Sequence, residues 1–319
     1  MSAPQPYRLS NSEAKEFKRC RRKWWLRSYR NLVPLREKVA GASSLGTRVH
    51  KALELISEGD TAAGLADFHA RVNADVHDFP EQEKEIRAEA DLALAMIEGY
   101  IEWIAEEGGD EDIEVLSNEE VISADLPHHL LTYTPVQLIG KLDQKVRRIS
   151  TGERSFRDYK TVQDFSRIRL LQMDTQMKHY HLIEMLTLAN EGQDRETLEA
   201  ERAGGAIYEM IRKVKRSARA KPPFFMRHEV RHNFEEMRNY YHSIAAQAHE
   251  IIITWNRLDS GESHQTAVPP NPTRDCSWDC DFVAVCPMFD DGSHVEEMLE
   301  ITYRKGDALA RYTEKADDL

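Results

Sequence analysis

The sequence predicts an α/β (α+β) fold in which a mostly antiparallel sheet, with helices between its strands, follows a helical N-terminal part. Three observations predict this order. Apolar residues at helical spacing come first, runs with strand composition follow, and a last helical pattern leads into a Pro-rich tail that carries cysteines. Such an order is typical of an enzyme core with a sheet packed between helices, and residues at about 60–110 form a helical insertion in it.

Each element has its own signal. Ser10 followed by Glu13 is a capping-box start for a first helix, on which Phe17, Cys20 and Trp24 lie at helical spacing. The other predicted helices are 46–58, 81–107, 167–190 and 233–258. The predicted strands are 113–124, 136–149, 154–161, 205–214 and 224–231. The turn at 150–153 joins the second and third of these strands into a hairpin.

Composition places the chain of 319 residues among globular proteins, since 41% of it is hydrophobic and 8% is aromatic. Its apolar runs fall short of the roughly 20 residues that span a bilayer, and residues 1–10 lack the apolar core of a signal peptide. We therefore expect a soluble, cytoplasmic protein without a membrane partner. The net charge of -12 argues against a nucleic-acid binder unless the cations are gathered locally.

Cations are gathered in two places. Residues 15–30 hold eight basic residues and one acidic residue, with aromatic residues among them, and a second basic stretch spans 212–231. A solvated helix face or loop would explain either run. The aromatic residues favour a surface that binds a nucleic-acid strand for the first run, because bases stack on aromatic rings. The candidate contacts are Arg21, Arg22, Lys23 and Trp24.

The most informative segment is a pair of predicted strands that carry Asp143, Asp158 and Lys160. Residues two apart on a strand point to the same face, so Asp158 and Lys160 project together. A hairpin turn lets Asp143 lie beside them. Two carboxylates form a hard-oxygen site for Mg²⁺ or Mn²⁺, and an adjacent lysine can position or deprotonate a water and offset charge on a phosphate. Phosphodiester hydrolysis needs these parts, whereas the alternative is a surface hairpin with scattered charges.

With three further segments, this pattern resembles the PD-(D/E)xK nuclease superfamily, and within it the RecB-like nucleases and the related CRISPR-associated exonucleases. Residues 46–54 (GTRVHKALE) resemble that family's upstream helix. Residues 158–161 (DYKT) resemble its D-Y-K-T strand, and residues 176–180 (QMKHY) its downstream Q-x-x-x-Y helix. The resemblance implies a restriction-endonuclease-like mixed sheet flanked by helices. Compact relatives of this kind are common in phages.

The resemblance also implies roles for single residues. His50, Asp143, Asp158 and the Tyr159 carbonyl would hold the metal, Lys160 would be catalytic, and Gln176 and Tyr180 would assist with substrate. Taken alone, His50 would be an ordinary histidine on an amphipathic helix, and Gln176 and Tyr180 would be packing and surface residues. The family usually has a glutamate on the strand before the first aspartate. Glu119 and Glu120 are both candidates, and alternation along the strand slightly favours Glu120.

The four cysteines are Cys20, Cys276, Cys280 and Cys286, three of them arranged as C-x₃-C-x₅-C. Such a set suits a tetrahedral zinc or a [4Fe–4S] cluster, but structural zinc sites usually use two close pairs. Nucleases of this family with an iron–sulfur staple show the same layout, with one cysteine before the core and three after it, so the resemblance implies a structural [4Fe–4S] cluster. The three-residue spacing after Cys276 is a departure, since many relatives have two. Buried free thiols are the remaining alternative.

Sequence and resemblance together predict three segments. These are an N-terminal helix segment at 1–45, a nuclease core at 46–265, and a cysteine segment at 266–319 that closes on the N-terminal helix. The expected function is a Mg²⁺- or Mn²⁺-dependent exonuclease on single-stranded or end-exposed DNA, in replication, recombination or repair. The alternatives are a non-cleaving iron–sulfur DNA-binding or adaptor protein on the same scaffold, and a zinc-stapled hydrolase of another substrate.

Overall fold

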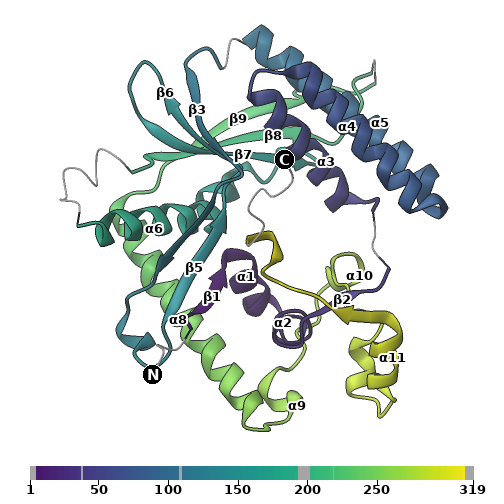
Figure 1. Ribbon diagram of the computed structural model, residues 1–319, viewed down its shortest axis with the longest axis vertical. Helices are drawn as coiled ribbons and strands as arrows, with labels where there is room; N and C mark the ends of the chain where they lie inside the picture. The colour runs from purple at the N-terminus through teal and green to yellow at the C-terminus, as the bar shows by residue number, and fades with distance from the viewer. Residues whose placement is uncertain (1–4, 37–38, 108–109, 193–201, 218, 313–319) are drawn as a thin grey trace.

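Three sheets and the helices between them make up the computed structural model, which describes residues 5–36, 39–107, 110–192, 202–217 and 219–312 (Figure 1). The ends of the predicted terminal segments, 1–4 and 313–319, lie outside the described residues. The largest sheet has the order β3 (Ile113–Asn118), β6 (Gln144–Arg148), β7 (Arg154–Val162), β8 (Gly205–Arg212) and β9 (Phe225–Val230). Strands β7 and β8 pair in parallel, and the other neighbours in this sheet pair antiparallel. The predicted α/β class is confirmed, and the arrangement is consistent with a restriction-endonuclease-like fold.

Two smaller sheets complete the framework. One has the order β1 (Tyr7–Ser10), β5 (Val136–Lys141) and β4 (Val121–Asp125), with β1 parallel to β5. The other pairs β2 (Leu32–Pro34) with β10 (Tyr303–Lys305). The sequence pattern predicts none of β1, β2 and β10, because strands of three or four residues are too short to show alternation.

Two of the predicted strands are wrong, because each is a pair of strands in the structure. In both, the chain bends from one sheet into another. The run 113–124 divides into β3 and β4 around Glu119, whose φ of 49° is the left-handed conformation of a sharp turn. The run 136–149 divides into β5 and β6 around Leu142 and Asp143. Two main-chain hydrogen bonds join the bends. The Glu119 amide donates to the Asp143 carbonyl at 3.0 Å, and the Leu142 amide donates to the Glu120 carbonyl at 2.9 Å. Asp143 therefore lies at the corner where the two larger sheets meet.

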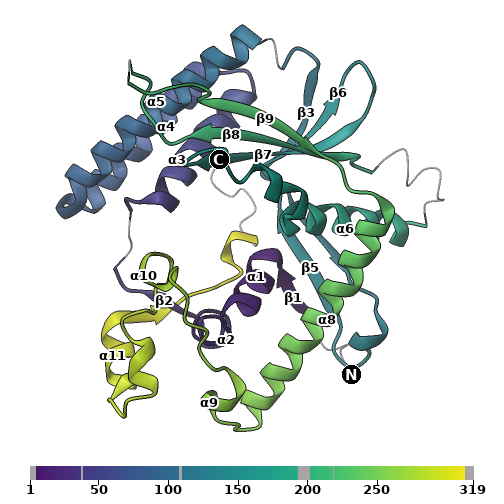
Figure 2. The ribbon, with the colours of Figure 1, turned by 180° about the vertical axis from the view of Figure 1, so that it is seen from behind.

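The longer helices surround these sheets (Figures 1 and 2). They are α1 (Asn11–Arg19), α3 (Ala42–Ser57), α4 (Thr61–Asp78), α5 (Glu83–Glu107), α6 (Thr175–Asn190), α8 (Phe234–Asp259) and α11 (Val295–Thr302). Shorter helical segments are α2 (Arg21–Trp24), α9 (His264–Ala267), α10 (Cys276–Asp279) and the 3₁₀ turns η4 (Ile168–Met173) and η5 (Cys286–Phe289). The predicted helix 167–190 is thus interrupted at Asp174, which caps α6 by accepting from the Gln176 amide. None of the helices that the structure describes has the length and apolar character of a membrane span.

Two hydrophobic clusters cover opposite faces of β7. Tyr159 belongs to the cluster that includes α3, α4 and α5, which form the helical insertion and the helix before it. Phe156 belongs to the cluster that includes Met177 and Tyr180 of α6. Because side chains alternate along a strand, Asp158 and Lys160 lie on the Phe156 face, toward α6.

The two ends of the chain pack together, as the sequence predicts. In Figure 1 the yellow C-terminal elements lie beside the purple α2 and β2. The Arg22 guanidinium makes a two-pronged contact with the Asp290 carboxylate, with one pair of atoms 3.0 Å apart, and Arg30 pairs with Glu296 at 2.6 Å. The ribbon of β2 and β10 extends this contact through main-chain hydrogen bonds.

Candidate active site

Strand β7 and helix α6 bring four of the predicted site residues into one hydrogen-bonded chain. Asp158, which is 2% exposed, accepts at Oδ1 from Lys160 Nζ and from Gln176 Nε2, each at 3.1 Å. Lys160 Nζ also donates to Gln176 Oε1 at 2.8 Å. Gln176 Nε2 lies 3.2 Å from the Tyr180 hydroxyl, which donates to the Lys141 carbonyl at 2.8 Å. The four-residue spacing of Gln176 and Tyr180 places both on one face of α6, against β5 and β7.

The sheet corner adds Asp143 to this group from the other side. Its Oδ2 lies 3.2 Å from His50 Nδ1 and accepts from the Tyr159 amide, also at 3.2 Å. His50 comes from α3, whose close approach to β7 is marked by Gly46, because a Cβ there would lie 3.4 Å from Thr161 Oγ1. The structure therefore places His50, Asp143 and the Tyr159 main chain beside Asp158. The role of the Tyr159 carbonyl stays a prediction.

Burial and neighbouring charges separate the pKa values of these groups. Burial raises the pKa of Asp158 to about 6, and the Asp143 carboxylate adds to that shift while Lys160 opposes it. Burial also disfavours ionisation of Asp143, but contacts with His50 and Lys160 outweigh it and lower the pKa of Asp143. Burial would lower the pKa values of His50 and Lys160, yet their carboxylate partners raise both. A further cation beside Asp158 would therefore stabilise its charged form.

The donor atoms suit a hard divalent cation. Asp158 Oδ2 is buried and pairs with Lys160 Nζ at 2.8 Å. Carboxylate oxygens are the ligands that a hard divalent cation prefers. Within the described residues, however, no group of three or more His, Cys, Asp or Glu side chains is arranged to hold a metal ion. The ion pairs of His50 with Asp143 and of Lys160 with Asp158 explain this, since they occupy the donor atoms. The residue types fit Mg²⁺ or Mn²⁺, and binding requires these side chains to turn.

Two further residues shape the site: Gly140, which the sequence marks as the glycine before Asp143 without showing its packing role, and Gln144, which sequence reasoning missed. A Cβ on Gly140 would lie 2.7 Å from Cε1 of Tyr180, so a glycine in β5 is what lets the Tyr180 ring pack there. Gln144 is 1% exposed and binds three partners, accepting from the Tyr159 hydroxyl at 3.2 Å and donating to Ser57 and Asn118. The position of Gln144 directly after Asp143 was the one available signal, because its partners are distant in sequence.

The two candidate glutamates lie at the sheet corner. Glu119 pairs with Lys141 at 2.5 Å, and it is close enough to Glu54 of α3 to raise the pKa of Glu54, which burial raises further. Glu120 accepts from the Ser117 hydroxyl at 2.6 Å. Among the described residues, the side chain of neither glutamate forms a hydrogen bond or ion pair with the Asp143 or Asp158 side chain, and the choice between them stays open.

The four cysteines converge from the two ends of the chain. Cys20 lies between α1 and α2, Cys276 begins α10, Cys280 follows α10 and Cys286 begins η5. Burial raises the pKa values of the Cys280 and Cys286 thiols, and Cys20 is close enough to raise both further. All four are free, partly exposed thiols. They are gathered in one region. In the part of the chain that the structure describes, however, they are not arranged as a group that could hold a metal ion.

Burial excludes Trp24 and Arg22 from the predicted strand-binding surface of the first basic run, and the contacts of Arg21 and Lys23 with a strand stay a prediction. Trp24 is fully buried, with its indole donating to Glu13 at 2.9 Å, so it offers no face to a base. Arg22 is 1% exposed and is held by Asp290. Lys23 pairs with Glu16 at 3.4 Å, and Arg21 reaches Glu250 at 3.1 Å. This run contributes mainly to the joining of the chain ends, which is why it is both basic and aromatic.

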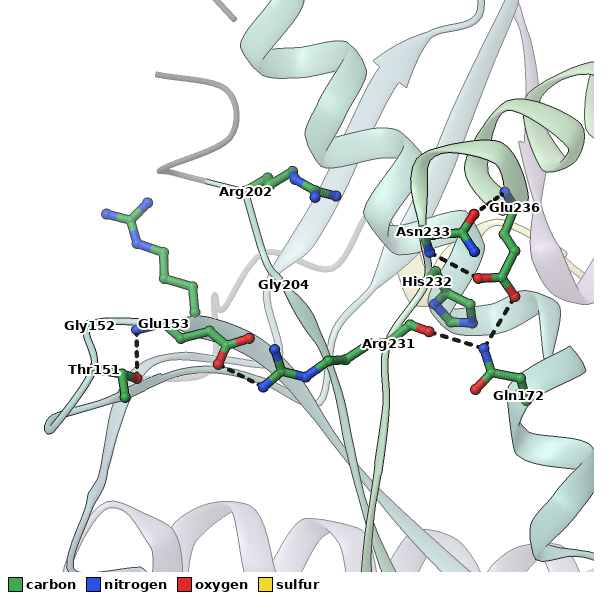
Figure 3. A pocket seen from close by; sticks show the side chains of 11 residues that line it. Thr151, Gly152, Glu153, Gln172, Arg202, Gly204, Arg231, His232, Asn233 and Glu236 are labelled. Atoms are coloured by element: carbon green, nitrogen blue, oxygen red, sulfur yellow. Dashed lines mark hydrogen bonds and ion pairs between the residues drawn. The ribbon is translucent and has the colours of Figure 1, made fainter. Parts of the chain in front are cut away.

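A separate cavity lies away from the carboxylates. It has a volume of about 750 Å³ and is lined by the β6–β7 turn, the residues before β8 and the start of α8 (Figure 3). Arg231 crosses it to pair with Glu153 at 2.8 Å, and Gln172 joins the Arg231 carbonyl to Glu236. Arg154, at this end of β7, is roughly 13 Å along the strand from Asp158. The apolar cluster of Phe156 lies between, so this cavity is separate from the candidate active site.

A family model described as the PD-(D/E)XK nuclease superfamily matches residues 8–287, which include the carboxylates, Lys160, His50 and all four cysteines. No curated protein sequence matches the chain significantly.

Proposed function

The chain belongs to the PD-(D/E)XK nuclease superfamily, and on that premise we propose that it is a Mg²⁺- or Mn²⁺-dependent DNA exonuclease. Its substrate would be single-stranded or end-exposed DNA, in replication, recombination or repair. The observation that carries the proposal is the buried Asp158 beside Asp143, paired with a lysine that Gln176 also holds. A hairpin with scattered surface charges would not bury a carboxylate next to a second one.

Each residue has a role in the proposed mechanism. His50, Asp143, Asp158 and the Tyr159 carbonyl would hold the cation, which when bound supplies charge neutralisation at the scissile phosphate. Lys160 positions the attacking water and offsets negative charge that develops on the phosphate oxygens. Gln176 holds the Lys160 amine between itself and Asp158, and Tyr180 fixes the Gln176 amide.

Digestion of end-labelled oligonucleotides beside circular single-stranded DNA tests the activity. We expect Mg²⁺- or Mn²⁺-dependent shortening of the linear strands, intact circles, and loss of cleavage by at least a thousandfold in Asp158→Asn. Asp164→Asn is the matched control, because Asp164 is exposed and bonded to Ser166. Cleavage that survives in Asp158→Asn removes the mechanism, and cut circles replace exonuclease by endonuclease. Binding without any cleavage supports the non-cleaving adaptor.

We also propose that the four cysteines hold a [4Fe–4S] cluster that joins the chain ends. Their convergence from opposite ends, with Cys20 near both Cys280 and Cys286, supports this assignment. The Thr273 amide donates to Cys276 Sγ at 3.4 Å, a contact that suits a thiolate ligand. Iron and sulfide analysis of the purified protein should give about four of each per chain. Cys280→Ser should lose the brown chromophore and stability, whereas zinc in place of iron would overturn the cluster.

A further inference from the structure

Two cavities adjoin along α1 and α8, which lie side by side (Figures 1 and 2). Their volumes are about 570 Å³ and 520 Å³, and they share Lys18 of α1 with Ser243 and Gln247 of α8. We call these two adjoining cavities together the trough. We propose that the trough binds a single strand of DNA whose continuation reaches the carboxylates. This inference rests on the proposed nuclease function and adds a path for its substrate.

One end of the trough lies against the start of α6. Asp174 and Thr175, the two residues before Gln176, line it there. Lys15 pairs with Asp174 at 2.7 Å, and the Thr175 hydroxyl donates to Asn11 at 2.8 Å, so α1 is fastened to this point. Asp174 is also close enough to Lys160 to favour its charged form. A strand in the trough thus ends beside the helix turn that carries Gln176.

The trough is positive although the chain carries a net charge of -12. Among described residues, five basic and two acidic side chains line its two cavities. Lys15, Arg19 and Arg21 are paired with carboxylates. Lys18 on α1 and Arg167 before η4 are exposed and form no ion pair or side-chain hydrogen bond with any described residue. Two unpaired cations that line one cavity are suited to the phosphates of a strand bound there.

Apolar groups lie at the same end of the trough. Leu170 is 52% exposed and Met173 is 65% exposed, and both line the cavity with Arg167. Single-stranded DNA offers phosphates on one side and apolar base faces on the other, and proteins bind it by combining cations with apolar contacts. A free phosphate or a small anion would gain nothing from the exposed leucine and methionine.

The length of the trough sets the number of nucleotides it can hold. Its α8 wall extends from Tyr240 to Glu250, and ten residues of helix rise about 15 Å. At about 3.4 Å per stacked nucleotide, this is room for roughly four nucleotides. The far end reaches Cys20, so the proposed cluster would lie where the strand leaves the trough.

Binding of fluorescein-labelled dT₁₂ to the whole protein in EDTA tests the trough without relying on cleavage. The test variant is Lys18→Gln/Arg167→Gln, and affinity is measured between 50 and 200 mM salt. Losing two phosphate contacts on a single strand should reduce the slope of log K against log salt by about 1.4 and weaken binding roughly tenfold at 0.1 M. Lys84→Gln/Arg87→Gln is the matched control, because it removes two exposed cations from α5, away from the trough.

An unchanged slope in the trough variant, or equal losses in both variants, overturns the inference. Failure of wild-type protein to bind dT₁₂ in a salt-dependent way does so too. A third outcome separates the two proposals. If the salt slope falls in the trough variant alone, and wild-type protein cleaves nothing with Mg²⁺ or Mn²⁺, then the trough proposal is supported and the nuclease proposal fails. The two proposals are thus judged by separate measurements.

Discussion

At the scale of single residues, the candidate site is built around a carboxylate that the fold does not favour as an anion. Asp158 is buried on β7 beside the carboxylate of Asp143. Lys160 pairs with both of its oxygens and Gln176 donates to one of them. A folded protein keeps such a group at a cost to its stability, which is typical of residues retained for function.

The raised pKa of Asp158 predicts how stability depends on pH. Its folded pKa of about 6 is above the ordinary carboxyl value of 3.8, so the folded state holds this proton more tightly than the unfolded chain does. The contribution is present at low pH and is lost as pH rises from about 4 through 6. Asp158→Asn should therefore exceed wild type in free energy of unfolding by roughly 2–3 kcal/mol at pH 8 in EDTA. Chemical denaturation at pH 4 and 8 measures this, and an equal or lower stability at pH 8 contradicts it.

Substitution of Gly140 should disturb the candidate active site through Tyr180. In Gly140→Ala the new methyl group would meet the Tyr180 ring at 2.7 Å, so the ring must move and its hydroxyl must leave the Lys141 carbonyl. Overpacking of this kind costs about 1–3 kcal/mol. We expect a lower melting temperature together with lower cleavage. Tyr180→Phe keeps the ring and removes the hydroxyl, so equal behaviour of the two variants would show that packing is not the cause.

At the scale of elements, α6 connects the two larger sheets. His179 lies 3.1 Å from the Ile139 carbonyl of β5 and 3.0 Å from the Tyr240 hydroxyl of α8. His181 lies 3.2 Å from the Gly205 carbonyl at the start of β8 and stacks on Phe156. Because both faces of α6 are buried by different sheets, it shows little amphipathic pattern, yet it carries Gln176 between them.

The buried histidines of α6 predict destabilisation by acid. Burial lowers the pKa of His179 to about 4 and that of His181 to about 3. As pH falls below the ordinary value near 6.5, the unfolded chain gains protons that the folded state does not, so stability is lost. Each histidine contributes up to about 1.4 kcal/mol per pH unit in this window. His179→Gln should reduce the slope of unfolding free energy between pH 6.5 and 4 by about one proton, and an unaltered slope would refute the assignment.

At the scale of the whole molecule, contacts between the two chain ends hold the N-terminal helices and the cysteine segment together. Arg22 is buried beneath η5, where its guanidinium contacts both oxygens of Asp290 and the Cys286 carbonyl. These contacts exist independently of any metal group. The same closure gathers the cysteines and builds one wall of the trough.

Replacing Asp290, the partner of Arg22, tests whether these contacts hold the chain ends together. Asp290→Ala leaves the buried guanidinium without its carboxylate, and because Asp290 is 47% exposed we expect a loss of roughly 2 kcal/mol, less than for a fully buried pair. Asp291→Ala, which loses a contact with Ser293, is the control and should change stability little. Urea denaturation measures both. Equal stabilities of Asp290→Ala and wild type would mean that the chain ends are held by other contacts alone.

Local patterns in the sequence were enough to predict strand β7 and the helix residues that face it. The period of two places Asp158 and Lys160 on one face, Ser10 caps the first helix as expected, and the spacing of Gln176 and Tyr180 directs both toward β7. These features depend on residues that are close in sequence, where backbone geometry fixes side-chain direction.

What the sequence by itself determined was the class of the fold and the placing of Asp158 and Lys160 on one face of a strand. The tertiary structure decided that Asp143 lies at a corner between two sheets, that Trp24 is core, and that Lys18 and Arg167 line one cavity. The physical reason is that sheet registration and burial depend on partners far along the chain, such as β1 on β5 and α8 beneath α1. No local pattern encodes which distant surface a residue will meet.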